Sequence, residues 1–300
     1  MTTKIKSYLQ LFGLIIFIAS CSKETTSPSP NPNPNPVVTQ PPLLLKKFIV
    51  IDPHIAPPND TIEAYVYTFD NLDRCTMINY VRYPGMETDT TIQYYNGTDT
   101  NMNKRDIHYN GASTTDYQEF FRYSSNGKMI SDSTISIYAA SPPSTTVYHY
   151  DIPNDSTVYT NVIPPAILYR HLNQHSKKDA AGNITFELDS VFAYNSSTGT
   201  FPFSFLKQVK TTYDTNPNPF YRIYPKRPTQ YDYNTLADDI PFFLFIPQKN
   251  NILSETDNNG GPVFNYLHSF VYSYNTNGSP ATVIFSNSTT GYALKGIFVY

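Results

Sequence analysis

The sequence predicts an all-β protein, built as a large antiparallel meander. The 300 residues include 26 tyrosines and 19 phenylalanines but no tryptophan, and aromatic residues favour pleated, half-buried surfaces. Apolar and polar residues alternate over many short runs, which is the period of a β-strand. Turn signals that contain asparagine and glycine separate these runs. Such signals are typical of hairpins, in which neighbouring strands are antiparallel.

Residues 1–20 are predicted to be a lipoprotein signal peptide. Lys4 and Lys6 form a short basic segment, and an apolar run follows from Leu11 to Ile18. Ile18-Ala19-Ser20-Cys21 is a small-residue cleavage site that ends in cysteine. The segment resembles the bacterial lipobox, and this resemblance implies that cleavage leaves Cys21 as an acylated N-terminus.

Two other interpretations of this segment are a transmembrane anchor and a secretory signal cleaved without lipidation. The apolar run is far shorter than the roughly 20 residues that a helix needs to cross a bilayer, and the cysteine argues against the second interpretation. Several acyl chains hold a protein stably on a membrane, since each buried methylene contributes roughly 0.8 kcal/mol. We therefore expect a lipid anchor in the outer membrane, with the choice between the periplasmic and the surface-facing leaflet left open.

Residues 21–43 are predicted to be the lipidated cysteine followed by a proline-rich stalk. From Ser22 to Pro42 the chain reads SKETTSPSPNPNPNPVVTQPP, with almost no residue able to join a core. Such tracts are extended and semi-rigid, at about 3.1 Å per residue. A peptide ligand for proline-binding domains is the less favoured alternative, because such domains are not expected at a bacterial surface.

The composition excludes some classes of function. Removal of residues 1–20 leaves 19 basic against 24 acidic residues, a net charge of −5. Beyond short pairs such as Lys177-Lys178 there is no basic cluster, so nucleic acid is not an expected partner. Cys75 is the one cysteine left after acylation of Cys21, which excludes an intramolecular disulfide. We expect Cys75 to be a small buried apolar residue.

Residues 44–300 are predicted to form the antiparallel β-domain. From Ile62 to Phe69, strand alternation puts Ile62, Ala64 and Val66 on one face and the aromatic residues on the other. In the run 184–189, the apolar residues alternate with Thr185, Glu187 and Asp189, which predicts a buried apolar face and a wet polar face. Residues 281–285 alternate in the same way, and Gly296 to Tyr300 is expected to be the last strand.

Hairpin turns are expected at Asn126-Gly127, Gly182-Asn183 and Asn277-Gly278, with Asn-Gly suited to the type I′ turn. A tyrosine-containing sequence motif recurs around two of these turns, over residues 121–128 and 271–279, and a degenerate copy covers residues 178–184. The irregular spacing indicates a repeated hairpin and not a solenoid.

These motifs are similar to the hairpins of YD-type repeats. With residues 212–221, 249–255 and 272–275 they resemble a family of Bacteroidota lipoproteins that carry a domain of unknown function. The resemblance covers roughly residues 160–300. It implies a porin-like sheet, so that the meander would be curled into an open barrel or half-barrel, and it implies no activity. Residues 44–160 share only the general character of the family's sequences, and an additional subdomain in this range is left open. Glu187, Asp189, Lys207 and Lys210 lie in predicted strands, which argues against a barrel with a continuous lipid-facing apolar band.

The segment from Pro217 to Pro247 interrupts the alternation. It contains six prolines, which cannot donate to a central sheet ladder, so we expect a long irregular connection. Long loops on a rigid scaffold are frequent binding surfaces. The candidate binding residues are its tyrosines, Tyr221, Tyr224, Tyr231 and Tyr233, with a glycan or an envelope protein as the partner. The alternative is that the tyrosines throughout the chain simply cover a two-sided sheet.

No catalytic, metal or cofactor motif stands out in the sequence. His171 and His175 share a face but lack a third metal ligand. Glu255, Asp257 and Asn259 imitate the start of a calcium loop, but Tyr266 stands where a bidentate carboxylate is needed, so a polar turn is expected. We therefore expect no cofactor and no catalytic residue, and a binding or structural module of the envelope. A hydrolase whose carboxylates converge only in space, such as a glycoside hydrolase, is the alternative.

Overall fold

The computed structural model describes residues 43–85, 87–111, 115–137, 144–151, 156–162, 169–193, 195, 197–200, 202–226, 247–259, 265–288 and 290–300. These residues belong to one compact unit, Pro41–Tyr300. The predicted signal peptide, Cys21 and the stalk up to residue 42 lie outside the described residues.

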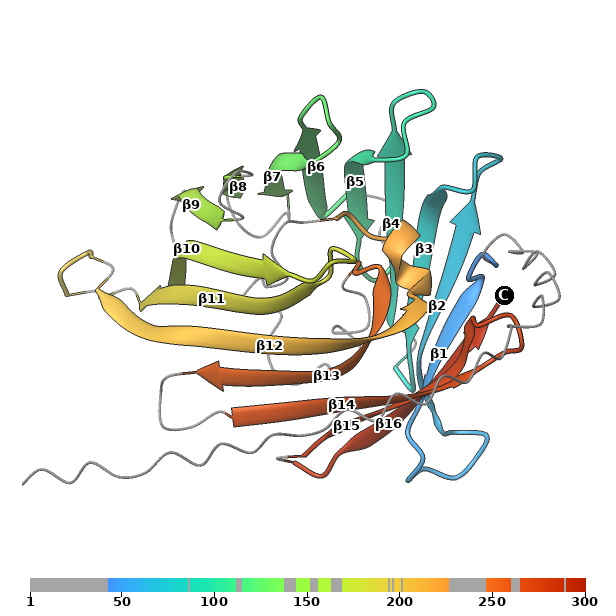
Figure 1. Cartoon of the computed structure of the whole chain (residues 1–300). Helices are drawn as coiled ribbons and strands as arrows, with labels where there is room; N and C mark the ends of the chain where they lie inside the picture. Colours follow the sequence, from blue (N-terminus) through green and yellow to red (C-terminus); the bar gives the residue numbers. More distant parts are fainter. Residues whose placement is uncertain are drawn as a thin grey trace, which may run out of the picture. The chain divides into compact units, whose positions relative to one another are not determined.

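The described chain is a succession of β-strands with one short 3₁₀ helix, η2 (Figure 1). This confirms the all-β prediction. The strands are β1 (Lys47–Ile51), β2 (Thr61–Phe69), β3 (Cys75–Arg82), β4 (Glu87–Tyr95), β5 (Met102–His108), β6 (Tyr117–Tyr123), β7 (Met129–Ser136), β8 (Ser144–Asp151), β9 (Ser156–Val162), β10 (Tyr169–Lys178), β11 (Ile184–Ala193), β12 (Phe203–Pro217), β13 (Asn250–Asn259), β14 (Asn265–Tyr274), β15 (Pro280–Asn287) and β16 (Ala293–Val299), and η2 (Pro219–Arg222) lies between β12 and β13.

Every strand pairs antiparallel with the next strand in sequence, so the expected meander that curls around an interior is confirmed (Figure 1). The pairing goes one step further than an open or half-barrel. β1 pairs with β16, from Lys47 opposite Val299 to Ile51 opposite Lys295, and this closes the pairing order into a barrel. The shortest stretch of pairing is between β9 and β10, where the register runs only from Leu172 to His175.

The three turns of the repeated motif have the same geometry. Ser124 N–H donates to the Lys128 carbonyl at 2.8 Å, and Gly127 N–H donates to the Ser124 carbonyl at 2.9 Å. The turns at Gly182 and Gly278 repeat both bonds. Only the glycine has a positive φ in each turn, at 77°, 91° and 80°. The predicted hairpins are confirmed, but the type I′ prediction is wrong, because a type I′ turn needs two consecutive positive φ angles.

One end of the barrel interior is apolar. Phe48 is fully buried, with its ring 4.9 Å from that of Phe298 and 5.4 Å from that of Phe220 of η2. Val283 and Phe285 of β15 are also fully buried, as their alternation predicts, and Gly296 lies where a β-carbon would be 2.5 Å from the Phe48 ring. This end is the main hydrophobic core of the described chain.

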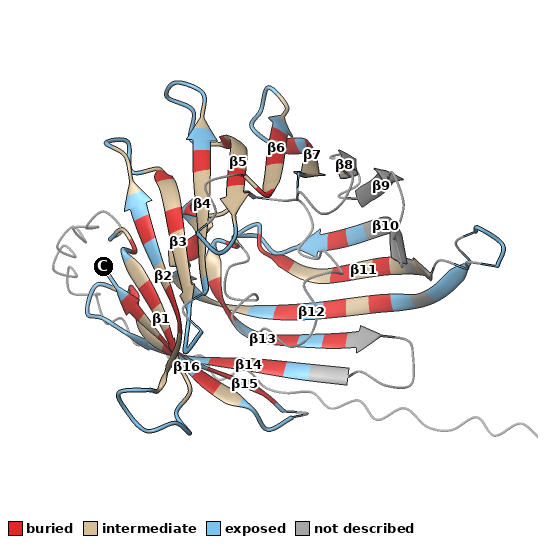
Figure 2. Cartoon of the chain, turned by 180° about the vertical axis from the view of Figure 1, so that it is seen from behind, coloured by how far each residue is buried: buried red, intermediate tan, exposed pale blue. Residues whose placement is uncertain are grey.

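The other end of the interior is charged, and here the prediction for residues 184–189 is wrong. Glu187 and Asp189 are 1% and 2% exposed, whereas Phe186 and Leu188 are only half-buried. Figure 2 shows buried and less buried residues in turn along β11. The reason is a register shift beside Ile184, where β10 and β11 pair irregularly. A bulge adds one residue to one strand, so Ile184 shares the interior with Glu187 and not with Phe186.

The outer face is mixed. Val271 and Ile284 are opposite one another on β14 and β15 and are 65% and 49% exposed, while hydroxyl pairs such as Ser273 with Thr282 lie beside them at 2.7 Å. Of the four charged strand residues, Lys207 is inside together with Glu187 and Asp189, and Lys210 alone is outside. The three inward charges therefore carry no information about the outer surface. The described residues hold no helix with the length and apolar character needed to cross a membrane.

Candidate functional site

A pocket of about 360 Å³ lies at the end of the barrel where η2 meets two hairpin turns and the end of β6. Its walls come from the β2–β3 turn, the β4–β5 turn, the end of β6 and the segment that begins with η2. The lining residues are 72–74, 95, 100–102, 123 and 221–226. These segments are far apart in the sequence, and closure of the barrel brings them together.

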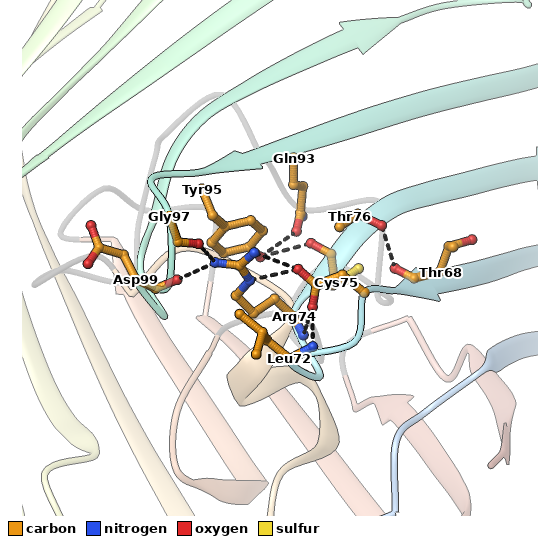
Figure 3. A network of polar contacts seen from close by, with 10 residues as sticks. Thr68, Leu72, Arg74, Cys75, Thr76, Gln93, Tyr95, Gly97 and Asp99 are labelled. Carbon is orange, nitrogen blue, oxygen red and sulfur yellow. Dashed lines mark hydrogen bonds and ion pairs between the residues drawn. The ribbon is translucent and has the colours of Figure 1, made fainter.

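Arg74 forms part of the pocket lining, and all three nitrogens of its guanidinium have polar partners (Figure 3). Nε donates to Asp70 Oδ2 at 2.7 Å, and Nη2 lies 2.7 Å from the same oxygen. Nη1 donates to the carbonyl oxygens of Gly97 and Asp99 at 2.6 and 2.9 Å. The Arg74 hydrogen bond lowers the pKa of the Asp70 carboxyl, which keeps the pair charged at neutral pH. Arg74 therefore ties the β2–β3 turn to the β4–β5 turn.

Tyr95 connects this part of the pocket lining to the segment after η2. The Arg74 guanidinium carbon lies 4.7 Å from the centre of the Tyr95 ring, within the range of a cation–π contact. The Tyr95 hydroxyl donates to the Cys75 carbonyl at 2.8 Å and to Gln93 Oε1 at 3.2 Å (Figure 3). The Gln93 amide in turn donates to the Ile223 carbonyl at 3.0 Å. The two sides of the pocket are thus joined by a continuous chain of polar contacts.

The N-cap and the buried side chains of η2 fix its position beside the pocket. Asn218 is the N-cap, since its side-chain oxygen accepts from Phe220 N–H at 2.9 Å, and Pro219 takes the first helical position. Phe220 and Ile223 are both 1% exposed and belong to the apolar end of the interior. Because the helix is anchored by its buried side chains, Tyr221 and Arg222 are held at the pocket.

The pocket carries an excess of positive charge on the η2 side. Arg222 and Lys226 line it, and Lys249 is close enough to affect Lys226 electrostatically. Lys226 Nζ lies 4.2 Å from the centre of the Tyr221 ring. Partial desolvation lowers the pKa of Lys226, and repulsion from Arg222 and Lys249 lowers it further. Lys226 is exposed by its total surface, so we attribute the desolvation to the ammonium resting on the ring.

Two of the four predicted binding tyrosines line this pocket. Tyr221 is half-buried, and desolvation raises its pKa. Tyr224 also packs against the apolar core, with its ring 6.2 Å from that of Phe220, and burial raises its pKa as well. Tyr231 and Tyr233 lie outside the described residues. Sequence reasoning missed Arg74, Tyr95 and the cations, because no local pattern links their turns to the proline-rich connection.

The expectation for Cys75 is confirmed. Its thiol is fully buried, burial raises its pKa to about 12, and Sγ lies 3.6 Å from the Met77 carbonyl oxygen. The thiol is therefore protonated at neutral pH and unsuited to nucleophilic chemistry.

Glu255 and Asp257 are not in a polar turn, so that expectation is wrong. They lie in β13 and point into the barrel, 0% and 7% exposed. Lys207 Nζ is 3.2 Å from Asp257 Oδ2, and His268 Nδ1 is 3.7 Å from Glu255 Oε1. His268 Nε2 also lies 3.2 Å from the Asn287 amide nitrogen. Acid and base thus alternate across neighbouring strands in this charged end.

The histidines and carboxylates of the described ranges show no metal site, and the carboxylates that lie close together are in the charged end of the interior and not in the pocket. His175 is exposed, and the side chain of His171 is outside what the structure describes. No group of three histidine, cysteine or carboxylate side chains within the described residues could hold a metal ion. Among the described residues that line the pocket, Asp73 is the one carboxylate. The pocket therefore offers cations, rings and hydrogen-bonding groups, which suit binding of a ligand.

No protein-family model matches the sequence, and no curated protein matches it. The resemblance to the Bacteroidota lipoprotein family with YD-like hairpins therefore stays a prediction. Among solved structures, the chain is similar to a porin-like protein from Bacteroides vulgatus and to a porin-like protein from Bacteroides uniformis. The TM-scores are 0.39 and 0.41, each at 10% identity, and each alignment covers 86% of this chain and 98% of the other.

Proposed function

We propose that the protein is a lipid-anchored binding module of the outer membrane, with no catalytic role, and that the pocket beside η2 is its ligand site. The lipobox-like segment that ends at Cys21 supports the anchor, and the stalk would hold the β-domain away from the membrane. The alternatives are a purely structural module, which would bind no fragment in the experiment below, and an envelope hydrolase, which would shorten a glycan that it binds.

The observation that carries the proposal is the pre-formed pocket itself. Its volume of about 360 Å³ is within the range of small-molecule sites, which are concave, largely pre-formed and lined by rings with a few polar groups. The Arg74 contacts and the buried Phe220 fix its two sides before any ligand arrives. Pre-organisation of this kind reduces the entropy lost on binding.

Binding is tested with the mature, acylated chain in detergent micelles on an array of glycans and peptidoglycan fragments. We expect saturable binding of at least one fragment, and at least a tenfold loss of affinity in Tyr221→Ala. Tyr292→Ala is the matched control, since Tyr292 is 39% exposed and outside the pocket lining. If both variants keep the affinity, the ligand binds outside this pocket. If no fragment of the array binds, a structural role is favoured.

The anchor is tested separately by fractionation of cells that express Cys21→Ala. We expect this variant to leave the washed membrane fraction, because the acyl chains would be absent. A variant that stays in that fraction would contradict the lipid anchor while leaving the binding proposal intact.

A further inference from the structure

Three cations lie near η2 without a balancing carboxylate among the described residues, and two of them, Arg222 and Lys226, line the pocket. Arg222, Lys226 and Lys249 are all exposed, and none of them is in an ion pair within the described ranges. Like charges that lie close together repel, and the lowered pKa of Lys226 reports this repulsion in addition to desolvation. A bound anion would relieve the repulsion and favour the charged form of Lys226.

Arg74 shows the contrast. Its charge is already balanced by Asp70, and two carbonyl oxygens accept from its Nη1. Arg74 is therefore part of the frame, whereas Arg222 and Lys226 have no carboxylate partner among the described residues. An arginine fork pairs with a carboxylate or a sulfate through two parallel bonds, and a lysine adds a point charge.

The rest of the pocket wall suits a hydroxyl-rich ring. Asp73, Thr100 and Asn101 also line it and offer a carboxylate, a hydroxyl and an amide. Tyr95 and Tyr221 contribute aromatic surface. The volume of about 360 Å³ is near the lower limit for ligand pockets, so the ligand must be small.

We propose that the pocket takes an acidic sugar of one or two rings, with its carboxylate or sulfate held by Arg222 and Lys226 and its hydroxyls by Asp73, Thr100 and Asn101. This inference rests on the proposed function, because it names the ligand class of the same site. The Asp73 carboxylate in the pocket lining would disfavour a second negative charge on the ligand, so a single acidic group per one or two rings is expected.

The test is calorimetric titration of the acylated chain in neutral detergent with three probes of equal length: a galactosyl-galacturonate that carries one carboxylate, the uncharged digalactoside and a monosulfated digalactoside. We expect at least one acidic probe to bind tenfold or more tightly than the uncharged one. Affinity should fall as salt rises, since salt screens exposed charges. Comparison of the carboxylate and sulfate probes, with inorganic sulfate as competitor, identifies which acidic group is preferred.

The matched variants are Arg222→Gln/Lys226→Gln in the pocket and Lys210→Gln/Lys295→Gln on the outer faces of β12 and β16. The first pair should remove the preference for the acidic probe, and the second pair should leave it unchanged although both remove two positive charges. Thermal unfolding of each variant checks that the fold is retained.

Three results would overturn the inference, and they separate it from the proposed function. An uncharged probe that binds as tightly as the acidic ones, with Tyr221→Ala still harmful, would overturn the acidic ligand and keep the pocket as the binding site. Acidic binding that the control pair weakens as much as the pocket pair would show a general charge effect. Absence of binding by all three probes would overturn the inference, while the fragment array tests the proposed function independently.

Discussion

The apolar and charged ends of the barrel interior are built on the same strands, yet they hold opposite chemistry. On β14, His268 faces Asn287 across the β14–β15 pair, and two residues further on Phe270 faces Phe285. On β13, Glu255 is fully buried, as is Ile252 on the other side of a register shift. Alternation alone decides which residues face inward. Which of those inward positions are apolar depends on the segment that covers each end of the barrel. At the apolar end this segment is η2, whose Phe220 packs into the interior.

The difference also separates two sources of stability. Burial of a large apolar side chain contributes about 1.5–3 kcal/mol, whereas buried ion pairs often gain little because desolvation offsets their attraction. We therefore expect the apolar end to stabilise the barrel and the charged end to be tolerated only while its partners remain together.

The largest expected effect is at the apolar end. Phe48→Ala should lower the free energy of unfolding by about 3–5 kcal/mol, because it removes the ring that contacts both Phe298 and η2. Val271→Ala is the control, since Val271 is 65% exposed on the outer face and its truncation should cost no more than about 0.5 kcal/mol. Chemical denaturation measures both. Equal losses would mean that the apolar end is not the main source of stability.

Removal of one charged partner should also be costly. Lys207→Met leaves the buried Asp257 carboxylate without the ammonium at 3.2 Å, and we expect a loss of about 3 kcal/mol. The double variant Lys207→Met/Asp257→Leu should recover most of this loss, since replacing both partners by apolar residues is often neutral. A double variant as unstable as the single one would show that the charged end contributes net stability.

A smaller loss is expected from Gly296→Ala. The added β-carbon would lie 2.5 Å from Phe48 Cζ and 2.8 Å from Val283 Cγ1, and such overpacking costs about 1–3 kcal/mol. Phe48→Leu in the same chain should relieve part of the clash, which a double-mutant cycle of unfolding free energies measures. Strict additivity of the two changes would contradict the close contact.

The smallest effect is a pH dependence at the charged end. Burial raises the pKa of Asp257 above 3.8 and Glu255 adds to the rise, while Lys207 and His268 oppose it. The folded protein therefore holds the proton of the Asp257 carboxyl more tightly than the unfolded chain does. The contribution of Asp257 to the free energy of unfolding is present below the unfolded pKa and is lost as the pH rises through the folded pKa. Relative to Asp257→Asn, the wild type should lose stability as the pH rises from 3.8.

Equilibrium unfolding of both proteins at a series of pH values measures this difference. A wild type that gains stability over the variant as the pH rises would contradict it, and would mean that attraction to Lys207 outweighs the cost of burial.

The sequence is sufficient for the strands and hairpins because their signals are local. The glycines at 127, 182 and 278 identify three turns directly, and the alternation from 281 to 285 predicts its buried face. The phase of Glu187 was not predictable in this way, since one bulge beside Ile184 exchanges inside and outside. Alternation also cannot tell a charged interior from a wet outer surface, because both place a polar residue at every second position.

The candidate site was predictable in part. The prolines between 217 and 247 indicate a connection that leaves the sheet, which points to Tyr221 and Tyr224. Arg74 and Tyr95 belong to turns more than a hundred residues earlier in the chain. They reach the pocket only through the closed order of strands, a long-range property that no short pattern records.

The pairing of β1 with β16 has a consequence for the timing of folding. Lys47 and Val299 are roughly 250 residues apart in sequence, so the first strand acquires its second neighbour only when the last strand has been made. Until then, β1 presents an unpaired edge next to the buried Phe48, and such edges attract other chains. The order of synthesis therefore leaves this edge open until the whole chain has been made, and closure of the barrel is a late step of folding.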